Sequence, residues 1–365
     1  MISKKNILFI SKWFSVAGTE TFMMNVLRNI NKRQFHIDFL LFSESTSAYS
    51  EEAERLGSKI YRLPARNTGL RYYRILDEFF KKNAGQYNAI HFCGGNLSSI
   101  APIYYAYKYK IPIRIIHSHS SDSQGMVNKI LHIINRRFIP LLGTCNLACS
   151  SLAAKYFFGK KDCTIIKNGV DTNKYKFNEE RRILFREKYD ISPSTHVLGH
   201  IGRFDEVKNH MLLVDIFIEY RKKHSDAKLL LVGTGILEDQ VKRKVNDLEI
   251  VDDVLFLGVR NDIPDILCAV DCFVMPSLFE GLPFVLVEAQ TSGLPCVVAD
   301  TINRDSKLTP YLAFRSLNDD LGLWVDDIEN LIGANRREDG FKYVEQRGFD
   351  VLSTVQYLEG LYVKE

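Results

Sequence analysis

Short apolar runs recur along this chain, and a loop followed by a helical pattern comes after most of them. The first run covers residues 7–10, and a helical pattern then extends to Ile30. Alternating strand-like and helical segments predict parallel strands covered by helices, which is the α/β class. A charged segment at 176–193 interrupts the alternation, and residues 197–203 restart it. A chain of 365 residues is long enough for two such domains.

The composition is that of a globular protein, with 46% hydrophobic and 25% charged residues. No apolar stretch reaches the roughly 18 residues of a membrane span, and the N-terminal run is too short for the core of a signal peptide. The seven cysteines are an odd number, and no histidine completes a zinc set around Cys145 and Cys149 or around Cys268 and Cys272. We therefore expect buried thiols, no metal and a cytoplasmic location.

The net charge of +4 conceals an asymmetry. Residues 1–175 contain 25 Lys and Arg against 11 Asp and Glu, whereas the remainder contains 23 against 33. Anionic membrane lipid on the inner face of the membrane, or a phosphate-bearing acceptor, would suit the basic half. Attraction between the two halves is the alternative, and the sequence leaves both open. Residues 126–142 could likewise form a basic amphipathic helix on a membrane surface, or an ordinary outer helix.

Two glutamates, Glu280 and Glu288, flank a turn that follows the apolar run at 272–277. The pattern predicts a buried strand, a loop that carries Glu280, and a helix with Glu288 about two turns along. Ligands of open α/β sheets bind at the carboxyl ends of strands, and backbone N–H groups between Gly281 and Phe284 would suit phosphate. Carboxylates repel phosphate, so the glutamates would bind hydroxyls. Together these groups fit a nucleotide-sugar, with solvated glutamates on an ordinary loop as the alternative.

Other strand ends carry further candidates. Arg203 ends the run that begins at 197, and Lys208 follows five residues later, a spacing at which two cations can bind one diphosphate. Gly233 begins a Gly-x-Gly turn, which by itself is a weak phosphate signal. His119 lies at the end of the run 113–118, where it could meet a hydroxyl, although a lone histidine is usually structural.

In this order the motifs resemble those of the retaining glycosyltransferases of the GT-B fold, glycosyltransferase family four, which contains glycogen synthases and bacterial mannosyltransferases. The motifs are Gly18 after the first strand, His119, Gly-Arg-Phe-Asp-Glu-Val-Lys-Asn at 202–209, Gly233-Thr-Gly, Phe256-Leu-Gly and Phe-Glu-Gly-Leu-Pro…Val-Glu-Ala at 279–289. The resemblance covers nearly the whole chain. The Gly-Thr-Glu-Thr helix start and the Asp300-Thr301 region look most like the bacterial exopolysaccharide and capsule subgroup.

This resemblance implies two Rossmann-like doubly wound domains with an interdomain cleft. The N-terminal acceptor-side domain would cover 1–175, the nucleotide-sugar-binding domain would cover 176–345, and a C-terminal helix at about 346–365 would cross back. The implied activity is a metal-independent, retaining hexosyl transfer in surface polysaccharide biosynthesis, with no cofactor. The donor is expected to be a UDP-sugar and the acceptor a lipid-linked or oligosaccharide glycan, with no nucleic acid partner.

The resemblance also assigns roles to single residues. Arg203 and Lys208 would bind the donor diphosphate and neutralise the leaving group. Glu280 would contact hydroxyls of the donor sugar, and Glu288 would contact those of the ribose. His119 would lie beside the donor sugar on the acceptor side. Further donor contacts are expected from Gly18, Gly233, Arg260, Gly281, Leu282 and Pro283.

One departure from the family pattern lies at 303–307, which lack the expected Pro-x-Glu-like sequence, so no role transfers to that loop. A nucleotide-sugar epimerase of the same fold and a non-catalytic GT-B partner subunit are the alternative functions. An epimerase would need a set of carboxylates at a strand end of the first domain, where the sequence offers none. A non-catalytic subunit fits poorly with a chain that keeps Arg203, Lys208 and both glutamates.

Overall fold

The computed structural model describes residues 4–14, 18–43, 47–120, 125–280, 282–334 and 337–364. The chain forms two compact units, Met1–Gly169 with Val351–Glu365, and Val170–Asp350. The chain passes from one unit to the other between residues 169 and 170 and between 350 and 351, a few residues from the boundaries expected after residues 175 and 345. The reason is that α8 (Thr172–Tyr175) and α15 (Gly340–Gln346) pack on each other and on α13 (Phe284–Thr291), all within the second unit.

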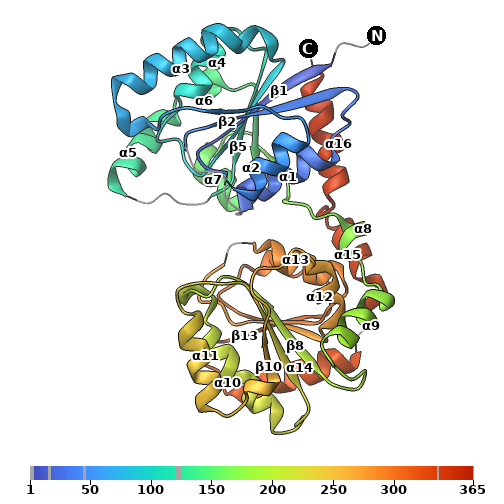
Figure 1. The fold of residues 1–365 in the computed structure, drawn as a ribbon. Coiled ribbons are helices and arrows are strands. Elements are labelled where there is room, and N and C mark those ends of the chain that lie inside the picture. Colours follow the sequence, from blue (N-terminus) through green and yellow to red (C-terminus); the bar gives the residue numbers. More distant parts are fainter. Residues whose placement is uncertain are drawn as a thin grey trace. The chain divides into compact units, whose positions relative to one another are not determined.

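The first unit is built on a sheet whose strands, among the described residues, are all parallel and follow the order β3-β2-β1-β4-β5-β6-β7. Figure 1 shows this sheet between its two layers of helices. Its strands are β1 (Lys5–Ser11), β2 (Phe35–Leu41), β3 (Ile60–Arg62), β4 (Ala89–Gly94), β5 (Ile113–Ser118), β6 (Cys145–Ala148) and β7 (Thr164–Ile165).

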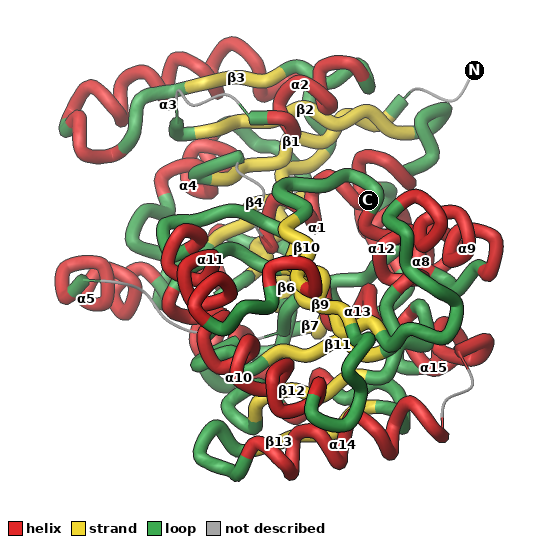
Figure 2. The backbone as a smooth tube through the Cα atoms, turned by 60° about the horizontal axis from the view of Figure 1, so that its bottom comes forward, coloured by secondary structure: helices red, strands yellow, loops and turns green. Residues whose placement is uncertain are grey.

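Two hydrophobic layers cover the faces of this sheet because its central strands are apolar on both sides. One face packs against α1 (Gly18–Asn29), α2 (Ala48–Arg55) and the C-terminal α16 (Val351–Tyr362). The other face packs against α3 (Leu70–Asn83), α4 (Ala101–Lys108), α6 (Ile139–Leu142) and α7 (Ser151–Phe158). A further helix, α5 (Met126–Asn135), lies at the edge of this unit in Figures 1 and 2.

The second unit repeats the plan with a parallel sheet in the order β10-β9-β8-β11-β12-β13. Its strands are β8 (Val197–Ile201), β9 (Lys228–Val232), β10 (Val254–Phe256), β11 (Cys272–Met275), β12 (Cys296–Ala299) and β13 (Leu312–Arg315). One face packs against α10 (His210–Arg221), α11 (Glu238–Asp247) and α14 (Leu321–Ala334), and the other against α9 (Glu179–Lys188), α12 (Ile263–Ala269) and α13. The prediction of two Rossmann-like doubly wound units is confirmed.

Two helices expected from the sequence have different bounds in the structure. The segment 126–142 forms α5 and α6, separated by a turn before Pro140. The C-terminal helix expected at about 346–365 begins later, as α16, because the chain turns around Gly348, whose φ of 74° favours glycine. Among the described helices, none combines the length and the apolar character needed to cross a bilayer.

A buried ionic cluster fixes α9 against the sheet of the second unit. The carboxylate of Asp271, the residue before β11, accepts hydrogen bonds from Arg182 at 2.7 Å and from Arg186 at 2.6 Å. It also accepts the Val197 backbone N–H at 2.8 Å, which ties it to β8. The Arg186 guanidinium donates further to the carbonyl of Ala269. Two cations therefore depend on one carboxylate in a region that is largely shielded from water.

Removing that carboxylate should destabilise the second unit strongly. We expect Asp271→Ala to lower the free energy of unfolding by about 3–5 kcal/mol, because the buried Arg186 guanidinium and the partly buried Arg182 guanidinium lose their counter-charge. Asp326→Ala is the matched control, since Asp326 pairs with Lys223 on the surface, and it should cost under about 1 kcal/mol. Urea unfolding followed by Trp324 fluorescence in a Trp13→Phe background measures both, and equal effects would contradict the prediction.

Candidate functional site

The candidate site of the second unit lies where the strand order of its sheet reverses. β8 pairs with β9 on one side and with β11 on the other, so the loops after β8 and β11 leave neighbouring strands in diverging directions. In doubly wound sheets this divergence opens a crevice at the carboxyl ends of the strands. The loop after β8 carries Arg203 and Lys208, and the loop after β11 carries Glu280.

The loop after β8 is held in place from both of its ends. Phe204 is buried, its N–H donates to the Thr234 carbonyl at 3.1 Å, and its own carbonyl accepts the Leu237 N–H at 3.0 Å. The Asp205 side chain accepts the Lys208 N–H at 3.2 Å and so caps the short 3₁₀ turn Glu206–Lys208. These contacts set the direction in which the Lys208 side chain leaves the turn.

The side chain of Lys208 passes close to Gly202. A Cβ atom added to Gly202 would come within 3.2 Å of the Lys208 side-chain carbons, so the absence of a side chain there makes room for the lysine stem. Arg203, the next residue, is exposed, and within the described part of the chain its guanidinium has no ion-pair partner. Arg203 is therefore available to an anion from outside the chain.

Lys208 and Glu280 form a direct ion pair, with both side chains 17% exposed. Their loops are also joined by the Leu278 N–H, which donates to the Val207 carbonyl at 2.8 Å, and Glu280 forms an isolated parallel bridge with Ile302. The structure thus brings together two of the predicted site residues that are 72 positions apart in the sequence. A cation and a carboxylate therefore stand next to each other at this edge of the sheet.

Gly233 lets the loops after β8 and β9 approach closely. Its φ is 129°, and a Cβ atom there would collide with the Gly202 carbonyl oxygen. Its N–H donates to the Gly258 carbonyl at 2.8 Å, which links the loop after β10 as well. Gly233 thus has a structural role in shaping this edge of the sheet, beside its predicted role in ligand binding.

Glu288 lies in α13 with a partner that the sequence did not suggest. Tyr175, in α8, donates a hydrogen bond to its carboxyl, and Lys174 contributes a positive charge. Burial outweighs both and raises the pKa of Glu288 to about 7, from an ordinary value of 4.5. The carboxyl can therefore take either protonation state near neutral pH.

The other predicted residues of this unit lie in different environments. Leu282 packs on the apolar cluster that includes Val287 and Phe349, and Pro283 precedes α13 and has no N–H to donate. Arg260 is paired with Asp262, its Nε donating to Oδ1 at 2.8 Å, which holds the pKa of Asp262 below its usual range. Gly281 lies outside the described residues.

In the first unit, His119 follows β5 and its N–H donates to the Gly94 carbonyl at 3.0 Å. Its ring lies 4.0 Å from that of His117 and 5.0 Å from that of Phe22, and both ring nitrogens are buried without a hydrogen-bond partner among the described residues. Burial lowers the pKa of His119 to about 3, so the ring is neutral at physiological pH. Gly18, also predicted, is the first residue of α1.

A cavity of about 790 Å³ opens at the carboxyl ends of β1 and β4, the reversal point of the first sheet. It contains residues that the sequence reasoning did not select, among them Lys12, Trp13, Glu20, Arg66 and Asn128. Glu20 is buried, and burial raises the pKa of its carboxyl. Glu20 belongs to the Gly-Thr-Glu-Thr helix start, whose cavity position was not foreseen, and Lys12 and Trp13 could have been identified only by their position after the apolar run at 7–10.

One group in the first unit has the composition of a metal site. His91, Cys93 and His117 are buried, and their ligand atoms lie within 4.8 Å of one another. However, His91 is already engaged at both nitrogens, with the Tyr362 hydroxyl at 2.7 Å and with His117 at 3.1 Å. These hydrogen bonds attach α16 to the sheet and account for His91 as a core residue, whereas His117 Nε2 is buried without a hydrogen-bond partner among the described residues.

Three comparisons place this chain among known proteins. Residues 195–313 match the family described as glycosyl transferases group 1. A Bacillus subtilis (strain 168) protein named as a glycosyltransferase, EpsF, is 29% identical over 99% of this chain and 97% of its own length. The Escherichia coli UDP-Gal:alpha-D-GlcNAc-diphosphoundecaprenol alpha-1,3-galactosyltransferase is 30% identical, over 55% of this chain and 54% of its own.

Among solved structures, that of Anabaena Alr3699/HepE in complex with UDP superposes with a TM-score of 0.80. It covers 97% of this chain and 98% of that chain, with 19% sequence identity. This likeness confirms the GT-B class of fold that the sequence motifs implied.

Because Gly233 lies so close to Gly202, adding a single methyl group at Gly233 should strongly reduce the stability of the second unit. We expect Gly233→Ala to destabilise the second unit by about 3 kcal/mol or more, since the added carbon meets a backbone carbonyl that cannot move freely. Gly258→Ala is the matched control, because its φ is 64° but open space surrounds it, and it should cost only about 1–2 kcal/mol. Urea unfolding of the second unit, with Trp324 as reporter, would contradict the prediction if the two costs were equal.

The raised pKa of Glu288 predicts that stability depends on pH. Well below pH 4.5 the carboxyl is neutral in both the folded and unfolded chain, and Glu288→Gln should match the parent. As the pH rises towards 7, the unfolded carboxyl ionises first, so the parent loses stability relative to the variant, by at most about 3 kcal/mol. Thermal unfolding between pH 4.5 and 8 tests this, and a constant difference across that range would contradict it.

Proposed function

We propose that this chain, whose residues 195–313 match the family of glycosyl transferases group 1, is a glycosyltransferase that moves a hexose from a UDP-sugar to a lipid-linked or oligosaccharide acceptor with retention of configuration. The observation that carries the proposal is the Lys208–Glu280 pair beside Gly202 and Arg203, at the reversal point of the second sheet. This arrangement offers cations to a diphosphate and a carboxylate to sugar hydroxyls at one edge of the sheet.

In the proposed reaction, the bond between the sugar C1 and the diphosphate oxygen breaks while C1 bonds to the acceptor hydroxyl oxygen on the same face. The acceptor proton passes to the departing diphosphate oxygen. Arg203 and Lys208 stabilise the negative charge that develops on the diphosphate, which is the largest electrostatic demand of the step. Glu280 orients the donor sugar, Glu288 binds the ribose, and neutral His119 lies on the acceptor side.

Two of the relatives support the choice of donor and acceptor. The Anabaena structure was solved with UDP, and the E. coli relative is named for UDP-galactose and for an acceptor with a diphosphate linked to undecaprenol. In the first unit, the 790 Å³ cavity provides Lys12 and Arg66 for such a diphosphate and Trp13, which is half exposed, for a sugar ring. We infer that this cavity receives the acceptor and that the product is a surface glycan.

Arg203→Ala and Lys208→Ala should each lower kcat/KM for the correct donor by about 10²–10³, because each removes a preorganised charge at the leaving group. Lys222→Ala is the matched control, since Lys222 lies on the surface and pairs with Glu219, and it should leave turnover unchanged. Release of UDP from a panel of UDP-sugars measures the rates, with melting temperatures to verify folding. Near-normal turnover in either site variant would refute the assignment.

The identity of the product separates the proposed function from an epimerase. Slow hydrolysis of the donor should release free sugar whose first-formed anomer is that of the donor, as read by NMR before mutarotation. An interconverted UDP-sugar would instead identify an epimerase, and an inverted anomer would exclude the retaining reaction.

A further inference from the structure

α5 faces its own unit with its polar side. The Leu97 N–H donates to His132 Nδ1 at 3.1 Å, His132 Nε2 donates to the Tyr156 carbonyl at 3.0 Å, and the Asn135 amide donates to the Leu97 carbonyl at 2.7 Å. The His132 ring also stacks on Tyr156 with centroids 4.0 Å apart. Hydrogen bonds and the contacts of the His132 ring with Tyr156 and Phe157, rather than an apolar stripe along the helix, therefore hold α5 to the protein.

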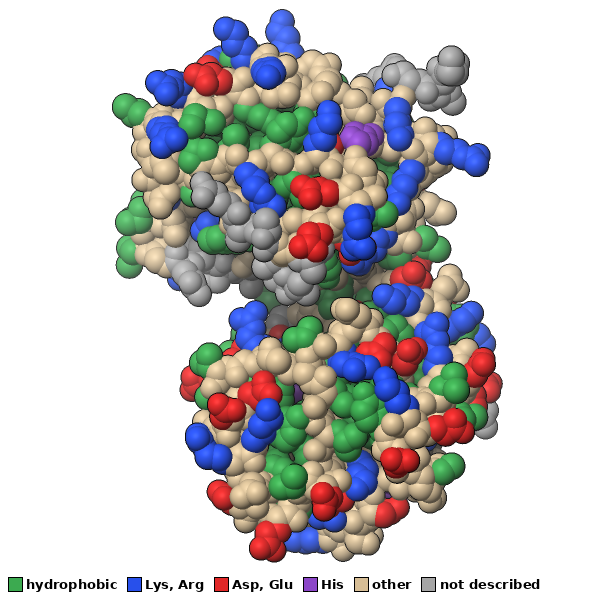
Figure 3. All heavy atoms as spheres, in the orientation of Figure 1, with side chains coloured by type: hydrophobic (Ala, Val, Ile, Leu, Met, Phe, Trp, Pro, Cys, Tyr) green, Lys and Arg blue, Asp and Glu red, His purple; other side chains and the backbone are tan. Residues whose placement is uncertain are grey.

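The opposite side of α5 is apolar and faces solvent. Exposure of its large hydrophobic side chains and of those continuing into α6 ranges from 48% to 73%, a set made of Met126, Val127, Ile130, Ile133, Ile134, Phe138 and Leu141. Figure 3 shows hydrophobic side chains at the edge of the first unit where Figure 1 places α5. A surface helix of a globular protein normally has the reverse arrangement, so these side chains, hereafter the α5 apolar face, call for an apolar partner.

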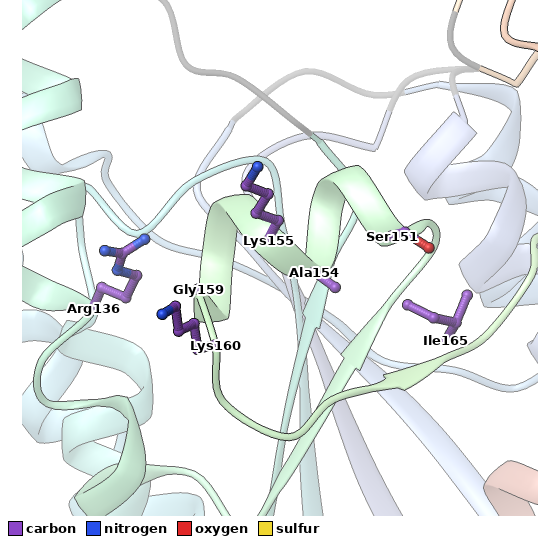
Figure 4. A pocket seen from close by; sticks show the side chains of 7 residues that line it. All are labelled: Arg136, Ser151, Ala154, Lys155, Gly159, Lys160 and Ile165. Atoms are coloured by element: carbon purple, nitrogen blue, oxygen red, sulfur yellow. The ribbon is translucent and has the colours of Figure 1, made fainter.

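The same segment is exclusively cationic. Residues 125–161 contain six Lys and Arg and no Asp or Glu. Next to α5, a cavity of about 540 Å³ is lined by three of these cations, Arg136, Lys155 and Lys160. Figure 4 shows the charged end of Lys160 turned towards Arg136, while Ile165 lies on the other side beside Ser151. The cavity therefore combines positive charge with an apolar wall.

We propose that the α5 apolar face inserts into an anionic phospholipid bilayer and that the cavity of Arg136, Lys155 and Lys160 binds a lipid phosphate headgroup. An amphipathic helix lies in a membrane interface when apolar burial and attraction to anionic lipid act together, and both groups are present here. A second copy of this chain fits the face poorly. A symmetric pairing would bring two sets of six cations together with no carboxylate from these segments between them.

The inward side of α5 connects this surface to the acceptor cavity. Asn128, in the first turn of α5, lines the 790 Å³ cavity and accepts a hydrogen bond from Arg66 at 3.2 Å. A bilayer bound to the outer side of α5 would therefore lie one helix away from that cavity. If the acceptor is lipid-linked, as in the proposed function, the membrane contact brings that acceptor close to the 790 Å³ cavity. Binding to the membrane does not itself depend on the transfer reaction.

Flotation of the full chain with vesicles tests the proposal directly. The chain should float with vesicles of phosphatidylcholine containing one third phosphatidylglycerol, and should remain largely unbound with phosphatidylcholine alone. Ile130→Ser with Ile134→Ser should weaken binding at least about tenfold, because two exposed isoleucines no longer insert. Lys155→Ala with Lys160→Ala should weaken it about 25-fold, at about fivefold per cation, and added salt should reduce this difference.

Ile183→Ser with Leu184→Ser is the matched control, since both side chains are similarly exposed, on α9 of the second unit. The proposal is overturned if either test variant floats as well as the parent, or if the control pair loses binding to the same extent. It is also overturned if the α5 variants alter dimer formation in sedimentation experiments but leave vesicle binding unchanged, because the α5 apolar face would then be a protein interface. The thermal shift produced by UDP should stay unchanged in all variants, so that failure of flotation and failure of the donor site are distinguishable.

Discussion

The reversal of strand order at the first strand of each sheet determines where a ligand can meet this chain. In both units the chain winds outwards from a central strand and then crosses back to that strand's other side. Crossover helices cover the faces of the sheet, so the diverging loops at the reversal point are the place where polar side chains can gather without displacing the core. Lys208 with Glu280 occupies that place in the second unit, and the 790 Å³ cavity occupies it in the first.

Close packing of the backbone shapes the candidate site of the second unit. Because Gly202 and Gly233 lack side chains, the loops after β8 and β9 touch through backbone atoms, and the Lys208 stem lies across the first of these glycines. Phe204 fixes the same loop from the inside. A charged side chain held by a packed loop loses little conformational freedom when it binds, which is the condition for electrostatic preorganisation.

Local patterns predicted the α/β fold, and they placed Glu280 and Lys208 on loops, because strand ends, turns and helix starts leave their signals within a few residues. The contact between these two residues could not be read in this way, since it depends on the pairing of β8 with β11. The partnership of Glu288 with Tyr175 was missed for the same reason, because it arises from the packing of α8 on α13. His119 was placed correctly after a strand, but its burial, and hence its neutral state, needed the structure.

The orientation of α5 is a further feature that hydrophobic periodicity alone could not predict. A hydrophobic pattern shows that apolar residues share one side of a helix. It does not show which side faces the core, because polar residues on the opposite side can also find partners in the protein. Here His132 and Asn135 find backbone partners in the unit and turn the apolar side outwards. An exposed apolar face alone would favour aggregation, whereas the six Lys and Arg of residues 125–161, a stretch with no Asp or Glu, oppose self-association and attract anionic surfaces. Charge and exposed apolar area together therefore describe a surface suited to reversible contact with lipid.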